Sequence, residues 1–555
     1  MSIGAKRAFQ PAREAICRAP TCRNHFIRWP PPIPVQLSSA QTDAEEHNRA
    51  EMMYVVGINV QLKNRTAQDD ALWLPSPTSS QFKAALEMVR EWLPLECVSC
   101  DPQELLFHGT SPWSYHHPDS LPGAVLYPRS TQDVAQIVKI ASKYHIPIVP
   151  FSGGTSLEGH FNAPSSAPVD PHNHHLHHHP AHEQDPRPSH GGLGLVVQPG
   201  VSYEDLNRHL RDLSSSSSSS ASSPHTLFFP VDPGPGAQIG GMIGTGCSGT
   251  NAVRHDARKR DQYDGRDGQR DVVKTRQRAK KCAAGPDLGK LFIGSEGTLG
   301  LVTEATLRLQ PVLPTSVGVA HFASVHAATS TVLELIKQGV SLACIELLDD
   351  QMMMAVNHAS DTFKYEEKPS LFLKFTGTQA QIKSDEELTA KILKRNGGSQ
   401  MKMAKSEAEA AEIWHARKVC LWSTLDYAPG HRAWTTDVCV PLSHLPRLIA
   451  DTKADIHARN LKATMLGHVG DGNFHCILLF NDHHELAQVR QCVHQMVRLA
   501  QDLDGTCTGE HGVGIGKMMH LEYELGKGTL DLLRKIKRTV DPQNIMNPGK
   551  LIPPT

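Results

Sequence analysis

The sequence predicts a mixed α/β protein, and its 555 residues favour roughly two to four domains. In the first half, the helical spacing of Val134–Tyr144 leads directly into the apolar run Ile146–Val149, which is the beginning of an α/β unit. From Leu313 onward, further helical and strand-like segments predict a second α/β domain.

Composition and charge disfavour several classes of protein. The net charge of −1 gives no overall attraction to nucleic acid or to an anionic membrane. The 12 cysteines form no repeated C-x-x-C pairs, which favours a reducing compartment over a secreted disulfide framework. No run of 18 apolar residues is present, so we expect no membrane-spanning helix.

The first 50 residues have the composition of a leader segment. Residues 1–40 hold one acidic residue, Glu14, against six basic ones: Lys6, Arg7, Arg13, Arg18, Arg23 and Arg28. Such Arg-rich, acid-poor N-termini are typical of mitochondrial transit peptides. We therefore expect a mitochondrial protein whose residues 1–50 lie outside the fold, although an ordinary disordered basic tail has the same composition.

A first folded domain is expected over residues 80–312. Periodicity predicts two helices and a strand within it, besides those already named: Phe82–Trp92, Tyr203–Leu213 and Gly194–Gly200. Two low-complexity inserts interrupt the domain, a His/Pro tract at 165–191 and a serine run at 214–223. The eight histidines between His172 and His190 are suited to binding metal, but such tracts are usually solvated loops. We expect neither insert to reach the core.

A second domain is expected over residues 313–552. Its predicted helices and strands are Val332–Gln338, Gln381–Asn396, Ser406–Leu421, Leu371–Phe375 and Ile477–Phe480. Ligand sites occur preferentially at domain interfaces, so we expect this domain to complete a site on the first one.

The most informative stretch of the first domain is Pro150–His160, directly after the apolar run. Its backbone-exposing glycines and its hydroxyl donors are Gly153, Gly154, Gly159, Thr155 and Ser156. Consecutive accessible N–H groups form a concavity that binds anions such as a pyrophosphate. The stretch contains neither a Walker motif nor a helix-opening G-x-G-x-x-G motif. On these residues alone, a phosphate site and a plain glycine-rich turn both remain open.

Two further segments, Phe229–Asn251 and Phe292–Thr303, are also rich in glycine and carry little charge. Together with Pro150–His160 they resemble the flavin-contacting segments of the vanillyl-alcohol-oxidase-type (PCMH-type) FAD-binding domain. Pro122–Val134 resembles the first strand and helix of that domain. The resemblance runs from about His108 to the C-terminus and is greatest to the D-2-hydroxyacid dehydrogenases. It implies a two-subdomain FAD-binding domain followed by a C-terminal cap domain that supplies the substrate pocket.

The resemblance implies that FAD is bound non-covalently, because no histidine stands where covalent relatives carry one and His160 lies beyond the turn. Asn547 matches a C-terminal segment that returns to the flavin, although Asn-Pro-Gly also simply ends helices. The residues implied in cofactor binding are Pro150, Ser152, Gly153, Gly154, Thr155, Ser156, Gly159, Pro233, Gly240, Gly241, Gly244, Cys247, Ser248, Gly249, Thr250, Glu296, Gly297, Gly300, Val302 and Asn547.

A candidate metal site comes from two glycine-containing stretches of the second domain. In His468-Val-Gly-Asp-Gly-Asn-Phe-His475, a sharp turn lets two imidazoles converge, and Glu510 adds a carboxylate farther along. Such a set leaves positions open on a divalent ion such as zinc, although histidines in turns often serve only as hydrogen-bonding groups. The resemblance implies that His468, His475 and Glu510 hold the metal and that His511 is the general base.

The resemblance also implies a substrate and a mechanism. Arg417 matches an arginine that binds the substrate carboxylate, although a solvated helical arginine is the alternative. The metal ion lowers the pKa of the substrate hydroxyl, His511 removes its proton, and hydride passes from Cα to flavin N5. The expected reaction is the oxidation of D-lactate to pyruvate, with cytochrome c or another carrier accepting the electrons.

Three alternatives remain. A D-2-hydroxyglutarate or glycolate dehydrogenase would share this architecture, but Thr435 and Thr436 stand near where the hydroxyglutarate enzymes have a lysine, which favours a monocarboxylate. The basic stretch Arg254–Lys281 suggests nucleic-acid binding, yet its only aromatic residue is Tyr263. The last alternative is a catalytically impaired relative.

That alternative rests on His255–Asp271, where the sequence departs from the family pattern. Relatives have an apolar strand here, whereas this segment is charged and has no period-2 apolar pattern. We expected that it could not form a central strand without burying unpaired charge. One back-translation, shifted by a nucleotide, restores the family-like pattern. We therefore hypothesise a reading-frame or splice error in this segment.

Overall fold

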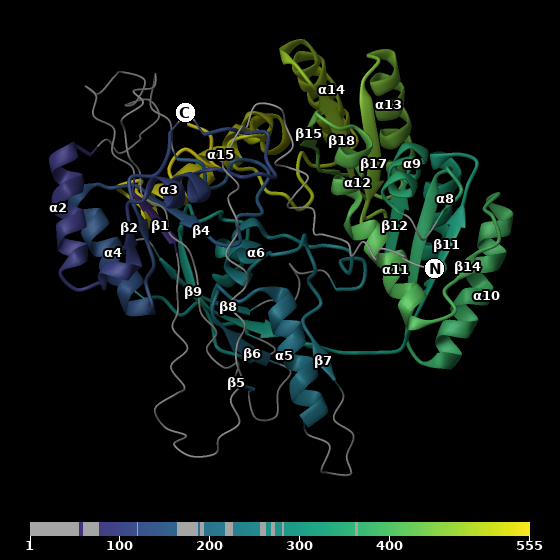
Figure 1. Ribbon diagram of the computed structural model, residues 1–555. Coiled ribbons are helices and arrows are strands. Elements are labelled where there is room, and N and C mark those ends of the chain that lie inside the picture. Colours follow the sequence, from purple (N-terminus) through teal and green to yellow (C-terminus); the bar gives the residue numbers. More distant parts are fainter. Residues whose placement is uncertain are drawn as a thin grey trace, which may run out of the picture.

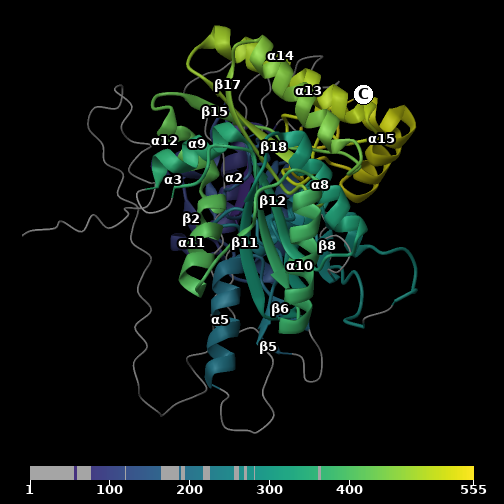
Figure 2. The same ribbon diagram turned by 90° about the vertical axis from the view of Figure 1, so that its right-hand side faces the viewer.

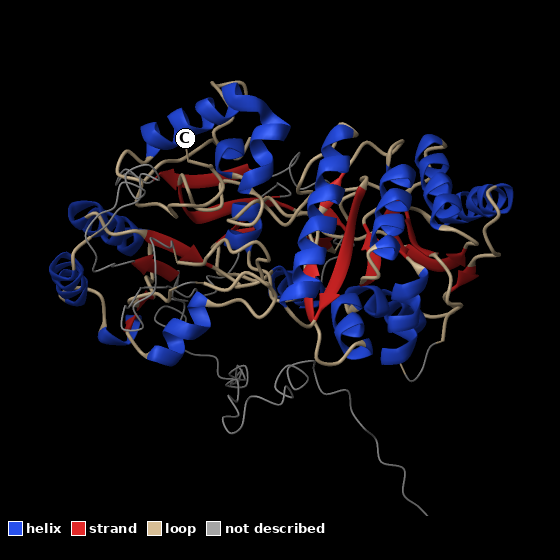
Figure 3. Cartoon of the chain, turned by 90° about the horizontal axis from the view of Figure 1, so that it is seen from above, coloured by secondary structure: helices blue, strands red, loops and turns tan. Residues whose placement is uncertain are grey.

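The computed structural model describes residues 55–58, 77–118, 120–163, 187–188, 194–216, 226–255, 262–267, 272–279, 282–360 and 364–554. The expected leader and most of both inserts lie outside these residues. The described chain forms two halves that lie side by side (Figures 1 and 3). Among the described helices, none is both long enough and apolar enough to cross a bilayer.

The first half begins with a four-stranded antiparallel sheet in the order β2-β3-β1-β4. Its strands are β1 (Val55–Ile58), β2 (Val98–Ser99), β3 (Val125–Leu126) and β4 (Ile148–Phe151). Three helices accompany it: α2 (Ser79–Arg90), α3 (Pro102–Gly109) and α4 (Thr131–Tyr144). Because β1 pairs with both β3 and β4, the domain extends upstream of the predicted boundary at residue 80.

Helix α4 confirms the strand–helix–strand prediction and shows its local causes. The Ser130 side chain caps the helix by accepting from the N–H of Asp133. One face buries apolar side chains against α2, including Val134, Ile137 and Val138. The helix ends at His145, whose φ of 56° is left-handed, and the chain turns into β4.

The second subdomain of this half is another antiparallel sheet, in the order β5-β6-β9-β8. Its strands are β5 (Arg187–Pro188), β6 (Gly194–Val197), β8 (Gln262–Asp267) and β9 (Gly300–Arg308). The helices α5 (Tyr203–Ser216) and α6 (Ile239–Thr245) pack on it, α7 (Gly289–Phe292) precedes β9, and β7 (Leu227–Phe228) pairs with β10 (Gln310–Pro311).

Parts of both inserts and of the charged segment contribute regular structure to this subdomain. The His/Pro tract does contribute to the sheet, since β5 pairs with β6, and the serine run begins inside α5, which continues to Ser216. The charged segment does form a strand, β8, which pairs with β9 across a register break between Asp264 and Arg266. An end position in the described sheet requires pairing on one side only, so the argument against a central strand does not apply there.

The second half contains an eight-stranded antiparallel sheet, seven strands of which follow the order β14-β11-β13-β12-β17-β18-β15, while β16 also pairs with β18. Its strands are β11 (Thr315–His321), β12 (Leu342–Leu348), β13 (Ser370–Thr376), β14 (Lys402–Met403), β15 (Arg432–Thr435), β16 (Val438–Cys439), β17 (Lys462–Gly467) and β18 (Asn473–Phe480). We call this half the cap.

Helices cover both faces of the cap sheet, as Figure 2 shows. One layer consists of α8 (Val325–Lys337), α10 (Gln379–Arg395), α13 (Leu445–Ala458) and α14 (His483–Asp502). The other consists of α9 (Asp350–Ala359), α11 (Glu407–Lys418) and α12 (Cys420–Tyr427). The single helix predicted at Ser406–Leu421 is thus two helices, which meet at Val419.

The last residues of the predicted second domain return to the first half of the fold. After η4 (Met518–His520) and α15 (Leu521–Val540), the N–H groups of Ile148 and Asn547 bond to the carbonyls of Ile545 and Ile148, at 2.6 and 2.7 Å. Ile545 and Met546 belong to the core of the first sheet. The last segment therefore completes the FAD-binding half.

Candidate active site

A cavity between the two halves brings the predicted site residues together. On the cap side it is lined by residues of α11, α12, β17 and β18 and of the loop that follows α14. On the other side lie the three glycine-rich segments. The predicted cofactor residues that line the cavity are Pro150, Ser152, Gly153, Gly154, Thr155, Ser156, Pro233, Gly240, Gly241, Gly244, Cys247, Gly249, Thr250, Glu296, Gly297, Gly300, Val302 and Asn547.

The glycines of this wall leave space for a flat cofactor. A Cβ atom added to Gly244 would have no protein atom within 4 Å, so it would occupy space in the cavity. At Gly153, a Cβ would lie 2.4 Å from the main-chain oxygen of Gly236, so the backbone packs too closely there for any side chain. The buried Oδ1 atom of Asn547 has no hydrogen-bond partner among the described residues. These features fit a bound FAD.

Two predicted cofactor residues do not line the cavity. Gly159, at φ 70°, lies where a Cβ would contact Ile515 Cγ1 at 2.7 Å, so it allows close packing against the loop after α14. Ser248 donates its hydroxyl to Glu510 Oε2 at 2.7 Å. Both residues therefore connect the FAD-binding half to the cap loop, a role that only the fold reveals.

Glu296 lines the cavity, but its carboxylate is engaged elsewhere. Its two oxygens accept hydrogen bonds from the N–H groups of Val513 and Gly514, at 2.6 and 2.8 Å. Asn547 Nδ2 donates to the main-chain oxygen of Glu296 at 2.7 Å. Glu296 therefore fixes the loop that carries Glu510 and His511 to the FAD-binding half.

His468, His475 and Glu510 converge as the sequence predicted. His468 follows β17, His475 lies in the adjacent strand β18, and Glu510 approaches from the loop after α14. Glu510 Oε1 lies 2.9 Å from His468 Nε2 and 3.3 Å from His475 Nε2. One ligand atom from each residue falls within 4.8 Å of the others, which is the geometry of a candidate metal site.

The charges of this trio are strongly coupled. Burial by itself would raise the pKa of Glu510, but His468 and His475 hold this pKa well below its usual value. Burial would likewise lower the pKa of His468, but Glu346 and Glu510 raise it well above its usual value. The carboxylate is therefore ionised and faces two imidazoles, and a divalent cation would replace the shared proton.

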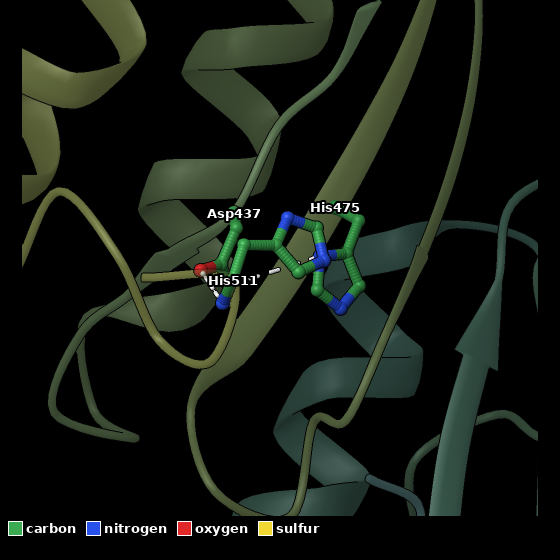
Figure 4. Close-up of side chains that lie close together, drawn as sticks. All are labelled: Asp437, His475 and His511. Atoms are coloured by element: carbon green, nitrogen blue, oxygen red, sulfur yellow. Dashed lines mark hydrogen bonds and ion pairs between the residues drawn. The ribbon is translucent and has the colours of Figure 1, made fainter. Parts of the chain in front are cut away.

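His511 lies beside the trio and stacks on His475, with ring centroids 4.9 Å apart and an interplanar angle of 13°. Figure 4 shows Asp437 next to both histidines, and its Oδ2 atom accepts from the N–H of His511 at 2.9 Å. The buried Nδ1 atom of His511 has no partner among the described residues. Burial lowers the pKa of His511 to about 4, against the opposing effect of Asp437. The imidazole is therefore neutral near pH 7 and can accept a proton.

Arg417 lines the same cavity from α11 and is buried. Its Nε and Nη2 atoms pair with Glu346 Oε2 at 2.7 and 2.6 Å. Its Nη1 atom is the guanidinium nitrogen that Glu346 does not engage. Burial would lower the pKa of Arg417, but Glu346 raises it, so the guanidinium is charged. The alternative of a solvated helical arginine was wrong.

Two family models match the chain. One described as FAD binding domain matches residues 122–261, and one described as FAD linked oxidases, C-terminal domain, matches residues 314–551. The mitochondrial D-lactate dehydrogenase (cytochrome) of Arabidopsis thaliana is 40% identical over 488 residues, which cover 87% of this chain and 81% of that protein. The chain belongs to this family of FAD-linked oxidases.

Other relatives agree with this assignment. The D-lactate dehydrogenase (cytochrome) 1 of Saccharomyces cerevisiae is 40% identical over 463 residues, covering 80% of this chain and 75% of that protein. Among solved structures, 4-ethylphenol oxidase from Gulosibacter chungangensis has a TM-score of 0.68 at 18% identity, covering 87% of this chain and 99% of that one. For p-cresol methylhydroxylase the TM-score is 0.66 at 14% identity, with 86% and 98% covered. These two structures confirm the fold predicted for this FAD-linked oxidase.

Of the two threonines considered in this FAD-linked oxidase, only Thr435 lines the cavity. Thr436 is 2% exposed, and its hydroxyl accepts from the N–H of Cys476, so it belongs to the sheet. Lys418, a second cation of the cavity wall, lies on the FAD-binding side, with its Nζ 5.9 Å from the centre of the Tyr203 ring.

The apolar part of the cavity wall could not be predicted from the sequence. These residues come from separate elements: Trp113, Leu421, Trp422, Leu466 and Ile477. Trp113 lies in a turn, and the other four fit their local helical or strand patterns as ordinary core residues, so no spacing signal distinguishes them. Asp437 and Glu346 were missed for a similar reason, although a single acidic residue within an apolar strand such as Leu342–Leu348 is a signal that could have been used.

Proposed function

We propose that this protein oxidises D-lactate to pyruvate with bound FAD as the immediate oxidant. The observation that carries the proposal is the position of neutral His511 against the His468–His475–Glu510 trio, in one cavity with the Arg417 guanidinium. This set offers a proton acceptor, a metal site and a carboxylate partner. Its relatives, named D-lactate dehydrogenases, support the choice of substrate.

The proposed roles follow from the positions of the side chains. The Nη1 atom of Arg417 binds the substrate carboxylate, while Glu346 holds the Nε–Nη2 edge of the guanidinium. His511 accepts the hydroxyl proton, since its imidazole is neutral and lies beside the trio. Cα then faces the glycine-rich wall, where the backbone allows a flavin to approach closely.

The two bound groups supply the rest of the chemistry. When bound, FAD would accept the hydride that leaves Cα, and a divalent ion such as zinc would lower the pKa of the substrate hydroxyl. His468, His475 and Glu510 would hold that ion, and their two imidazoles and one carboxylate fit it.

The cavity wall favours a small monocarboxylate. Leu466 and Ile477 are apolar, Thr435 carries no charge, and Lys418 lies on the FAD-binding side. Besides Arg417, Lys418 is the one Lys or Arg among the described lining residues, so the wall offers a second carboxylate few partners. This favours D-lactate over D-2-hydroxyglutarate.

We further propose that cytochrome c receives the electrons and that the protein acts in mitochondria. The names of these relatives include the words cytochrome and mitochondrial, and the basic composition of residues 1–40 supports import. Fractionation of cells that express the tagged full-length chain tests the location, and a purely cytosolic signal contradicts it.

One experiment tests the proposed reaction. The purified yellow protein is assayed with D-lactate, L-lactate, glycolate and D-2-hydroxyglutarate, using an artificial dye and then cytochrome c as acceptor. The proposal predicts the highest kcat/KM for D-lactate and reduction of cytochrome c. A clear preference for D-2-hydroxyglutarate or glycolate overturns the choice of substrate, and dye reduction without cytochrome c reduction overturns the choice of acceptor.

A further inference from the structure

Glu346 is a charged residue in the middle of an apolar strand. It lies in β12, whose seven residues are all buried, and its own side chain is fully buried. An ionised carboxylate in such surroundings is costly unless hydrogen bonds satisfy both of its oxygens. The hydrogen-bond partners of these two oxygens therefore indicate the role of Glu346.

The two oxygens of Glu346 contact two different site residues. Oε1 lies 2.7 Å from His468 Nδ1, and Oε2 lies 2.7 Å from Arg417 Nε and 2.6 Å from Arg417 Nη2. His468 and Arg417 come from different elements, the end of β17 and helix α11. One buried carboxylate thus joins the metal-ligand trio to the guanidinium in the same cavity.

Each contact leaves the functional atom of its partner available. With His468 Nδ1 donating to Glu346, Nε2 is the nitrogen that faces Glu510 at 2.9 Å and can bind a metal ion. Glu346 occupies Nε and Nη2 of Arg417 and does not engage Nη1. The same carboxylate therefore selects the metal-binding nitrogen of His468 and the ligand-binding nitrogen of Arg417.

We propose that Glu346 is a positioning residue that aligns the metal ligand His468 and the substrate-binding Arg417 through its two carboxylate oxygens. This inference rests on the proposed function and deepens it, because it makes metal affinity and substrate affinity depend on one side chain. Outer partners of metal-binding histidines commonly change metal affinity by about 10- to 100-fold when they are replaced.

The rival explanation is a purely structural ion pair that fastens α11 to the cap sheet. That role predicts a loss of stability on substitution, with unchanged zinc affinity and unchanged KM in the protein that remains folded. A positioning role predicts that both constants change in folded protein. A loss of stability alone therefore does not distinguish the two roles of Glu346, whereas the zinc dissociation constant and KM do.

The decisive variant is Glu346→Gln, which keeps the size of the side chain but offers a single acceptor oxygen. Its NH₂ group must face either His468 Nδ1–H or Arg417, and both are donors. Glu346→Asp keeps the charge but shortens the side chain by one methylene, so it cannot span both partners. Asp349→Asn is the matched control, since Asp349 is a buried carboxylate just after β12 that caps α9 and bonds to Lys453.

Three quantities are measured on purified, FAD-containing full-length protein: flavin absorbance, the dissociation constant for zinc ion by competition with a fluorescent chelator, and kcat and KM for D-lactate. We expect both Glu346 variants to retain flavin. Zinc binding should weaken about 10- to 100-fold, and KM should rise at least about 10-fold as the guanidinium loses its partner. Asp349→Asn should change stability but neither binding constant.

Several outcomes overturn the inference. Folded Glu346→Gln protein with wild-type zinc affinity and wild-type KM refutes it, and a change in only one of the two constants refutes the shared role. If Glu346→Gln does not fold, Glu346→Asp decides by the same criteria. Wild-type protein that binds no zinc refutes the inference together with the proposed metal site. Zinc binding that weakens in the variants, in a protein that does not oxidise D-lactate, supports the metal half and refutes the proposed substrate instead.

Discussion

The two sides of the cavity are built from different chemical groups. The FAD-binding side presents main-chain atoms and glycines, such as Gly153 and Gly244, with few charged side chains. The cap side presents ionised and imidazole side chains, among them Glu510, His511 and Arg417, which buried carboxylates hold in place. The shape of the backbone thus suits the binding of a cofactor. On the cap side, by contrast, charged neighbours position the side chains that bind and deprotonate the substrate.

This difference predicts that substitutions on the two sides of the cavity impair different properties of the protein. Adding a single carbon atom to the backbone surface should disturb FAD binding, because no side chain there can move aside. Removing a single side chain from the cap surface should disturb turnover and leave FAD in place, because its contributions are individual hydrogen bonds and charges.

The largest effect is expected for His511→Ala. Loss of a general base should lower kcat for D-lactate by roughly 100- to 10,000-fold, with FAD content unchanged because His511 belongs to the cap loop. Stopped-flow flavin reduction and the flavin absorbance ratio measure the two quantities. His457→Ala, on the outer helix α13, is the control. Wild-type flavin reduction by D-lactate in the His511 variant would rule out the base assignment.

Metal removal should be nearly as damaging. A divalent ion supplies several kcal/mol of stabilisation, so chelation should lower activity by roughly 100-fold or more, and zinc or another divalent ion should restore it. In His468→Ala and His475→Ala proteins the added ion should restore little activity. Full activity in metal-free wild-type protein, verified by elemental analysis, would contradict the site.

Gly153→Ala tests the backbone side. The new Cβ would lie 2.4 Å from the main-chain oxygen of Gly236, which cannot yield as a side chain would. Overpacking costs ~1–3 kcal/mol, so the dissociation constant for FAD should rise by roughly 5- to 100-fold. Gly528→Ala in α15 is the matched control, because a Cβ there meets no atom within 4 Å. Equal FAD affinity in the two variants would falsify the close-packing argument.

A smaller effect is expected from His520. Burial, with additional contributions from His494 and Lys517, lowers its pKa to about 4. The unfolded chain therefore takes up a proton below pH 6.5 that the folded protein does not, so stability should fall as pH decreases from 6.5 towards 4. In His520→Gln, the decrease of Tm over this range should be shallower, and in His457→Gln, an exposed site on α13, it should not change. Parallel curves for all three proteins would show that His520 does not contribute.

The charged segment at residues 255–271 can be tested directly at the level of the sequence. The FAD binding domain model matches only as far as residue 261, and β8 begins at Gln262. If the charged residues here come from a frame or splice error, the natural protein carries an apolar strand in the position of β8. Peptide mass spectrometry across 255–271, or sequencing of the transcript, tests this. Peptides that contain Asp264-Gly-Arg266 would end the hypothesis and favour a catalytically impaired flavoprotein.

Most elements were predictable because their patterns are local. Phe82–Trp92 and Val134–Tyr144 were found from periodicity, and both helices begin at side-chain caps upstream of the apolar residues. Strand pairing between segments that are far apart in the sequence was not predicted. Neither β1 nor the C-terminal strand-like pairing at Ile148 and Met546 carries a local signal of where it will pack.

The candidate site shows the same division. Glycine-rich loops and the His–Gly–Asp–Gly pattern indicated where backbone exposure and ligand atoms would be. They could not show that Ser248 would bond to Glu510 or that Glu296 would hold the N–H groups of Val513 and Gly514, because those contacts join separate halves.

The sequence by itself determined which chemical groups this protein has available: bare backbone for a cofactor, imidazoles and a carboxylate for a metal ion, and an arginine for a carboxylate. Only the tertiary structure decided which atoms of those groups are free. Glu346 occupies Nδ1 of His468 and two nitrogens of Arg417, and Asp437 accepts from the main-chain N–H of His511 and so places its ring. The reason is physical, since a buried polar atom must find its partner in space, and the partners here come from distant strands and loops.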